Sequence, residues 1–339
     1  MTKPTVMIAL GGNSLSPKGK TGSIEEQFSY TRKTIEGLSE FIDHNYNICI
    51  THGNGPQVGN ELFRMDLTND HVPPLSLGVC VAGTQGQMGY MIQQSLQNKL
   101  REMNIDREVV TLVTQVIIDK NDKSINNPTK YVGQIYSKNE ISLLSKKFNW
   151  NIKEQEPGNW RRVVPSPMPE YVMHGKSIKA LVGRGTIVIA SGGGGIPVYN
   201  NDEHKLEGMD AVIDKDFSAA KLGRIIKAEE LWIISDIEYL YRNFGEENQS
   251  PVKEISFSDF KNLYIENNFQ EGTIKPKIKA AIHFLKYHGE KVVITSINNI
   301  KRALRNQTGT IISKEIVPYW ISALNPASKS LVQRGSKSS

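Results

Sequence analysis

The sequence has few of the features that mark disulfide-bonded or membrane-spanning proteins. It contains two cysteines in 339 residues, Cys49 and Cys80, and both stand in apolar surroundings, so a disulfide framework is excluded. The longest stretch without a charged side chain, from Val72 up to Lys99, is interrupted by Pro, Gly, Gln and Ser and makes a poor membrane span. The first apolar run, Val6–Leu10, is too short for a secretion signal. We therefore expect a cytoplasmic protein with no membrane partner.

The excess of positive over negative charge is also small. The net charge is +6, and residues 326–339 contribute +3 of it through Lys329, Arg334 and Lys337. The remainder is too small to indicate a nucleic-acid partner. A hydrophobic content of 38% and a charged content of 22% are typical of a globular protein, with one large α/β domain or two smaller ones. We leave residues 326–339 out of the fold as a disordered tail or an engineered remnant.

Glycine, in contrast, is concentrated in three turns, and each turn follows a short apolar run. Gly11-Gly12-Asn13 follows Val6–Leu10, Thr51–Pro56 follows Ile48–Ile50, and Ser191–Pro197 follows Thr186–Ala190. Such runs are typical of buried parallel strands. Glycine at the carboxyl end of a strand lets backbone N–H groups approach an anion, and ligands of open α/β sheets bind at that edge. One such turn has a purely structural explanation, whereas three indicate a phosphate site.

Strand-like and helix-like segments alternate along the chain. This alternation predicts an α/β fold in which a mainly parallel sheet carries helices on both faces. The predicted strands are Val6–Leu10, Asn47–Thr51, Val109–Val116, Thr186–Ala190, Glu230–Ser235 and Lys291–Ile294. The predicted helices are Ser23–Asn45, Gln57–Asp66, Gln85–Met103, Asp214–Leu222 and Lys275–His288.

One segment, Ile118–Pro165, breaks this rhythm. It is polar, rich in Lys and Asn, and contains one plausible helix, Ser137–Phe148. An insertion of this length predicts a small protruding subdomain or lid, and a surface excursion without function is the alternative. Its polar composition predicts little apolar surface to bury.

Three lysines stand where a phosphate could be bound. Phosphoryl transfer requires cations, backbone donors and a carboxylate that organises them. Lys130 lies inside the insertion, and Lys215 lies between Asp214 and Asp216. Lys277 lies at a predicted helix start, where the helix dipole favours a bound anion and not a cation. An ordinary surface position is the alternative for each of them.

Other chemical signatures are weak or missing. Ser235-Asp236 ends an apolar run and fits ribose or metal recognition as well as a turn cap. The seven histidines are scattered, and only His52 adjoins a glycine turn. The sequence has no complete Walker motif, no strand-flanked Gly-x-Ser-x-Gly and no Gly-x-Gly-x-x-Gly after its first strand, which argues against a conventional dinucleotide fold. No set of metal ligands is predicted.

Several further motifs occur together and in one order. They are Ala9–Asn13, Thr51–Gly59, Gly83–Gly86, Asn127–Lys130, Trp160–Pro167, Gly192–Val198, Ala211–Asp216, Pro276-Lys277 and Gly309-Thr310. With these motifs the chain resembles the carbamate kinases, a family of the amino-acid kinase superfamily, over roughly residues 5–315. The resemblance implies reversible phosphoryl transfer between ATP and carbamate, which gives ADP and carbamoyl phosphate. It also implies Mg²⁺ as cofactor and use in arginine catabolism to make ATP.

The resemblance extends to the architecture and to the site. It implies a three-layer αβα sandwich over residues 1–320, a homodimer, and a protruding lid subdomain at residues 118–165. Lys130, Lys215 and Lys277 are implied to neutralise the transferring phosphoryl group, with Asp214 orienting them. The residues implied to bind substrate or phosphate are Gly11, Gly12, Asn13, Gly53, Asn54, Gly55, Gly193 and Gly194. Those implied on the nucleotide side are Ser235, Asp236, Tyr241 and Gly272.

The chain also departs from the family pattern in the lid. Tyr131 and Gln134 stand where the family has prolines that stiffen it, so we expect a loose lid. Two other hypotheses stay open. The altered lid favours a sister acylphosphate kinase that acts on another small carboxylate. A non-catalytic regulatory relative is the second, and the three lysines and Asp214 count against it.

Overall fold

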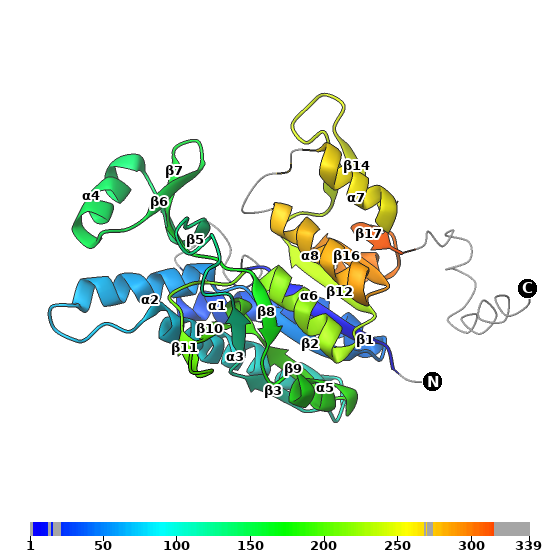
Figure 1. Cartoon of the computed structure of the whole chain (residues 1–339). Coiled ribbons are helices and arrows are strands. Elements are labelled where there is room, and N and C mark those ends of the chain that lie inside the picture. The colour runs from blue at the N-terminus through cyan, green and yellow to red at the C-terminus, as the bar shows by residue number, and fades with distance from the viewer. Residues whose placement is uncertain (1–2, 13–14, 16–21, 268, 270–273, 315–339) are drawn as a thin grey trace, which may run out of the picture.

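The computed structural model describes residues 3–12, 15, 22–267, 269 and 274–314, and its centre is an eight-stranded sheet (Figure 1). The strand order is β15 (Glu254–Ser256), β17 (Thr310–Ser313), β16 (Lys291–Ser296), β12 (Glu230–Ser235), β1 (Thr5–Leu10), β2 (Asn47–His52), β9 (Ile187–Ala190) and β3 (Val109–Leu112). Neighbouring strands are parallel except β16 and β17. The predicted mainly parallel sheet is confirmed.

Side chains alternate across this sheet and build one apolar layer on each face. In β1, Met7 and Ala9 belong to one cluster of buried residues, whereas Val6, Ile8 and Leu10 belong to the other. The first cluster is covered by α5 (Gly175–Gly183), α6 (Lys215–Ile226), α7 (Phe257–Glu266) and α8 (Ile274–Tyr287). The second is covered by α1 (Ile24–Asp43), α3 (Leu77–Glu102) and α9 (Ile300–Leu304). The arrangement is the predicted αβα sandwich.

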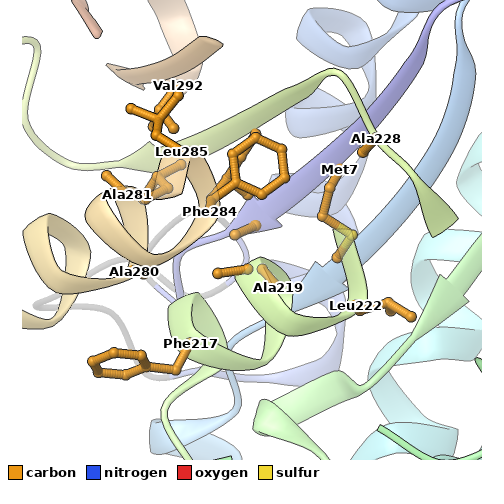
Figure 2. Packing of buried hydrophobic residues seen from close by; sticks show 14 of the residues in the cluster. Met7, Phe217, Ala219, Leu222, Ala228, Ala280, Ala281, Phe284, Leu285 and Val292 are labelled. Carbon is orange, nitrogen blue, oxygen red and sulfur yellow. The ribbon is translucent and has the colours of Figure 1, made fainter. Parts of the chain in front are cut away.

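Helices α6 and α8 approach closely because small residues stand where they meet. Figure 2 shows Ala219 of α6 and Ala280 and Ala281 of α8 in this region, with Phe284 beside Met7 of β1. All of these side chains are almost completely buried. This packing brings the amino-terminal ends of α6 and α8 to the same edge of the sheet.

The sequence prediction of one strand over Val109–Val116 is wrong. The segment forms β3 in the central sheet and then β4 (Gln115–Ile118) in a second sheet with β11 (Leu206–Gly208), β10 (Ile196–Asn200) and β8 (Pro169–Val172). Gln85 of α3 explains the break, since its Oε1 accepts from the Thr114 N–H at 2.8 Å and its Nε2 donates to the Thr114 carbonyl at 3.1 Å. The predicted helix that begins at Gln85 likewise starts earlier, at Leu77, behind the cap Ser76.

The predicted protruding segment forms a subdomain with its own sheet. Strands β5 (Lys130–Tyr136), β7 (Asn159–Val164) and β6 (Ile152–Glu156) pair antiparallel, and α4 (Lys138–Phe148), close to the predicted helix, follows the cap Ser137. In Figure 1 this subdomain stands apart from the central layers, above α2 (Gly55–Thr68). We call it the lid.

The expectation that the lid buries little apolar surface is wrong. Its fully or nearly fully buried side chains are Val132, Ile141, Trp150, Val163 and Val164. Val132 and Val164 share a cluster with Val58 and Leu62 of α2, so the lid is packed onto the body. These apolar residues stand singly or in pairs among polar and charged ones, so the sequence does not indicate that they form a core.

The smaller elements complete the outline. They are β13 (Leu240–Arg242), β14 (Ser250–Val252), and the 3-10 turns η2 (Gly192–Gly194) and η3 (Ile297–Asn299). Among the helices of the described residues, none combines the length and apolar character that a bilayer span requires. Residues 326–339, Asn13 and Gly272 lie outside the described residues.

Candidate active site

A cavity of about 320 Å³ lies at the carboxyl edge of the central sheet, where β1 adjoins both β2 and β12. The strand order reverses at this point, because the chain continues from β1 to β2 on one side and returns later to β12 on the other, and this is the usual ligand position in open α/β folds. Predicted residues that line the cavity are Gly11, Gly12, Gly53, Asn54, Gly55, Lys130, Gly193, Asp214, Lys215, Ser235, Asp236 and Lys277. Gly194 and Tyr241 do not line it.

The first two glycine turns lie against each other. A Cβ added to Gly53 would come 2.9 Å from the Gly12 nitrogen and 3.5 Å from the Lys215 Cδ, so a side chain here would separate the turns. The N–H of Gly11 already donates to the Ile234 carbonyl at 2.8 Å, and that of Gly53 to the Leu10 carbonyl at 2.9 Å. The expectation that these two N–H groups hold an anion is therefore wrong. The two glycines instead allow the close approach.

The third glycine turn is held by α3. Gln85 Nε2 donates to the Gly192 carbonyl at 3.0 Å, and the adjacent Thr84 Oγ1 accepts from Asn54 Nδ2 at 2.9 Å. A Cβ on Gly193, whose φ is +65°, would come 2.2 Å from Asn54 Nδ2. The Gly194 N–H donates to the Ser191 carbonyl at 3.0 Å, so it is also not an anion donor. Sequence reasoning overlooked Thr84 and Gln85 as the residues that fix both turns.

Asp214 joins the lid to the sandwich. It is the N-cap of α6, where its Oδ1 accepts from the Asp216 N–H at 2.9 Å. Its Oδ2 accepts from Lys130 Nζ at 2.6 Å, although the two residues are 84 positions apart. One carboxylate thus starts the helix and receives the lysine of the lid.

Asp216 lines the cavity, and sequence reasoning gave it no role. It is 2% exposed, and it pairs with Lys215 through Oδ1 and with Lys277 Nζ at 3.1 Å through Oδ2. The prediction that Asp214 orients all three lysines is therefore incomplete, because Asp216 receives two of them. Only an Asp-Lys-Asp pattern marked it in the sequence, and this pattern is common on surfaces.

Burial and charge act against each other in this cluster. Burial alone would raise the pKa values of Asp214 and Asp216, but Lys130 and Lys215 lower that of Asp214, and Lys215 and Lys277 lower that of Asp216 much further. Burial lowers the pKa of Lys215, and the charge of Asp216 offsets this only in part. Burial also disfavours the charged form of Lys277, but Asp216 and Asp214 outweigh it and raise the pKa. Within this cluster three ammonium groups thus face two carboxylates, an excess of one positive charge, while Arg161, Asp236 and Glu156 line other parts of the cavity.

The lid supplies further cavity residues that the sequence did not reveal. They are Tyr131, Gln155, Glu156 and Arg161. The Arg161 Nη2 donates to the Gly133 carbonyl at 2.7 Å and its Nη1 donates to Gln155 at 3.2 Å. Its buried Nε has no hydrogen-bond partner among the described residues. The guanidinium is fixed in place and adds positive charge on the lid side.

The side of the cavity where a nucleotide is expected also has apolar side chains. Ser235 and Asp236 line the cavity together with Ile237 and Ile274, which sequence reasoning did not single out. The Ser235 Oγ donates to the Asp236 carboxylate at 3.0 Å. Tyr241 lies in β13, with its ring centroid 6.4 Å from that of Tyr239. This part of the cavity offers apolar contact beside hydroxyl and carboxylate groups.

His52 does not face the cavity. Its ring Nδ1 lies 3.1 Å from the Gly53 carbonyl oxygen, and a Cβ on Gly192 would come 2.3 Å from its Nε2. The side chain is 1% exposed, and burial lowers its pKa to about 4. His52 is therefore a neutral packing residue and not a general base.

A dedicated metal cage is not found in the described residues, since no three His, Cys, Asp or Glu side chains group to hold an ion. Mg²⁺ in kinases needs only one or two carboxylates, with phosphate oxygens and waters completing its shell. Asp214 and Asp236 present carboxylates to the cavity. These residues fit a divalent cation that arrives with a nucleotide.

Comparison with known proteins agrees with this geometry. The model of the amino acid kinase family matches residues 4–296. A carbamate kinase of Pyrococcus furiosus is 42% identical over 307 residues, which cover 90% of this chain and 98% of that relative. Two structures of a Giardia lamblia carbamate kinase are each 32% identical over 93% of this chain and 100% of theirs. The one bound to citric acid has a TM-score of 0.88, and the one bound to AMP-PNP has 0.83.

The burial of His52 predicts a loss of stability in mild acid. Unfolded histidine titrates near pH 6.5, whereas folded His52 does so near 4, so the unfolded state binds more protons between these values. The contribution of neutral His52 to the free energy of unfolding, about 3 kcal/mol, is complete above pH 6.5 and is lost as the pH falls towards 4. Urea unfolding at pH 7.0 and 4.5 should show a smaller loss for His52→Gln than for the unmodified protein. The exposed His71→Gln is the control, and parallel losses in all three proteins would contradict the prediction.

Proposed function

Because the chain belongs to the amino acid kinase family, we propose that it transfers a phosphoryl group reversibly between ATP and carbamate, giving ADP and carbamoyl phosphate. The observation that carries the proposal is the convergence of Lys130, Lys215 and Lys277 with two aspartates around one cavity. The relatives named carbamate kinase match nearly their whole length, and one of their structures holds a nucleotide analogue. These findings support carbamate as the phosphoryl acceptor and ATP as the donor.

The lysines supply what phosphoryl transfer needs. The charge on the equatorial oxygens of the phosphoryl group is neutralised by the ammonium groups, which the aspartates hold in position before substrate binds. In the forward direction a carbamate oxygen attacks the γ-phosphorus, and the bond to the bridging oxygen of ADP breaks. No proton needs to be removed from the acceptor, since its oxygen is already anionic. The burial of His52 away from the cavity accords with this chemistry.

Mg²⁺ would be held by nucleotide phosphates with Asp236 and Asp214 nearby, and when bound it screens phosphate charge. Ser235, Ile237 and Ile274 would contact the nucleotide, and Arg161 would face the acceptor from the lid side. We further propose the direction of ATP synthesis in arginine catabolism and a cytoplasmic location. The two buried free cysteines suit a reducing compartment.

A homodimer is the proposed assembly, and α3 provides a surface for it. Val79, Gly83, Gly86, Tyr90 and Gln94 are exposed, uncharged and spaced along one face of this 26-residue helix. Val79 and Tyr90 are 51% and 58% exposed, which is large for apolar and aromatic side chains. A Cβ on either glycine would meet nothing within 4 Å, so a second helix can approach closely.

Incubation with ADP, carbamoyl phosphate and Mg²⁺ should yield ATP, which coupled luminescence measures. Chelation of Mg²⁺ by EDTA should abolish the signal, because the nucleotide then lacks its counter-ion. Acetyl phosphate in place of carbamoyl phosphate should give far less ATP, and a reversed preference would favour the sister acylphosphate kinase. Folded protein with no ATP above the chemical background would support a regulatory relative.

Lys215→Ala should lower kcat by at least about 100-fold, because a cation that acts on transition-state charge is worth roughly 3–4 kcal/mol. Asp216 keeps Lys277 as a partner, so folding should be retained. Lys279→Ala is the matched control, since Lys279 lies on the exposed face of α8. Circular dichroism checks the fold. Retention of more than about a tenth of kcat would show that Lys215 does not have this role.

Sedimentation equilibrium should give twice the 37.9 kDa chain mass. Gly83→Glu should shift the mass towards that of one chain, because it puts a charge and a long side chain into the uncharged face of α3. Leu143→Glu on α4, where the side chain is 73% exposed, is the control and should stay dimeric. A monomer without any substitution, or a dimer that is unchanged by Gly83→Glu, would exclude this interface.

A further inference from the structure

A glycine in the first half of α2 contacts the lid through backbone alone. Gly59 lies inside a helix, where glycine costs about 1 kcal/mol relative to alanine, so its position needs a reason. A Cβ at Gly59 would come 2.0 Å from the nitrogen of Gly133 and 2.1 Å from its Cα. Both atoms belong to the main chain of β5, so no side-chain rotation could relieve the overlap.

The partner is also a glycine for a conformational reason. Gly133 has φ +73°, which L residues seldom adopt. A Cβ on Gly133 would lie 3.5 Å from the Gly59 Cα, an ordinary contact distance. Substitution at the two positions therefore has different effects. A side chain at Gly59 overlaps the main chain of β5, whereas one at Gly133 strains its own backbone without overlapping α2.

This contact is close in the chain to two residues that line the cavity, Gly55 and Lys130. Gly59 is four residues, about one helical turn, after Gly55, and Gly133 is three residues after Lys130. Val58 and Val132, the preceding neighbours of the two glycines, are completely buried in the same cluster. A shift between α2 and β5 would therefore move Lys130 relative to the turn at Gly55.

A second attachment prevents the lid from pivoting freely about the glycines. Asp66, seven residues and about 10 Å further along α2, accepts from Arg162 Nη1 at 2.7 Å and from Trp150 Nε1 at 2.8 Å. The Arg162 guanidinium lies 4.8 Å from the Trp150 ring centroid, and the Phe63 ring of α2 packs 5.7 Å from the same ring. The lid is thus docked along α2 at two points.

We infer that Gly59 and Gly133 are positioning residues, whose contact sets Lys130 at its 2.6 Å distance from Asp214. The lid and α2 then act as one unit that carries both Lys130 and the turn at Gly55. This unit lies across the cavity from α6 and α8, which carry Lys215 and Lys277. The inference rests on the proposed function, since Lys130 has no kinetic effect otherwise. It opposes the expectation of a loose lid, because docking along α2 would hold β5 in position even without the missing prolines.

The test is a double-mutant cycle of Gly59→Ala and Lys130→Ala, measured as ATP formation from ADP and carbamoyl phosphate. Alone, Gly59→Ala should lower kcat by at least about tenfold while KM for ADP changes by less than about twofold. In the Lys130→Ala background the same substitution should lower kcat by less than about twofold, because the group it misplaces is gone. Gly183→Ala is the control, since Gly183 is also helical and its added Cβ meets nothing within 4 Å.

Hydrogen exchange gives a second measurement that does not depend on activity. Gly59→Ala should speed exchange of the amides in residues 130–136, while Gly183→Ala should not. Equal losses of kcat in both backgrounds, or unchanged kcat with unchanged exchange, would overturn the inference. An unmodified protein that makes no ATP would refute the proposed function, and exchange would still decide whether the contact holds the lid. If Gly59→Ala fails to fold, Gly133→Ala replaces it in the same cycle, because the backbone strain at φ +73° would also displace β5 and with it Lys130. Equal losses of kcat in both backgrounds would again overturn the inference.

Discussion

The arrangement of the cavity depends on burying ammonium groups beside carboxylates at the start of α6. An unpaired ammonium group is costly to remove from water, so Lys215 and Lys277 can stay charged there only next to Asp216. Asp214 fixes the beginning of the helix and receives Lys130 from the lid. The same two aspartates therefore start a helix, hold three lysines and join two parts of the chain. The single positive charge that this cluster leaves unbalanced is what a phosphoryl group would neutralise.

Much of the sandwich was predictable because its central strands are buried on both faces. Such strands appear as continuous apolar runs, and the turns at Gly11, Gly53 and Gly192 mark where each of them ends. Since parallel strands end at one edge, the location of the cavity followed from these turns. The role of the three lysines, however, came from a resemblance to known motifs, because their local sequence, even at the helix start of Lys277, left an ordinary surface position open for each of them.

The missed features depend on residues that are distant in the sequence. Thr114 interrupts a predicted strand because Gln85, 29 positions earlier, binds its backbone. The role of Asp216 appears only when α8 brings Lys277 against it. The core of the lid was not predicted because Trp150 and Val132 find apolar partners in α2 as well as in distant parts of the lid itself. Local composition cannot report contacts of this kind.

The separation of Lys130 from Asp214 also sets an order of events during synthesis. The two residues are 84 positions apart, and translation adds about 5–20 residues per second, so the lysine leaves the ribosome several seconds before its carboxylate. In that interval β1 lacks β12 on one side, and α2 and the lid can already dock. Lys277 emerges later still, 61 residues after Asp216. The nascent chain therefore balances the charges of its cavity late, when α8 brings Lys277 to Asp216 and before β16, α9 and β17 are added to the sandwich.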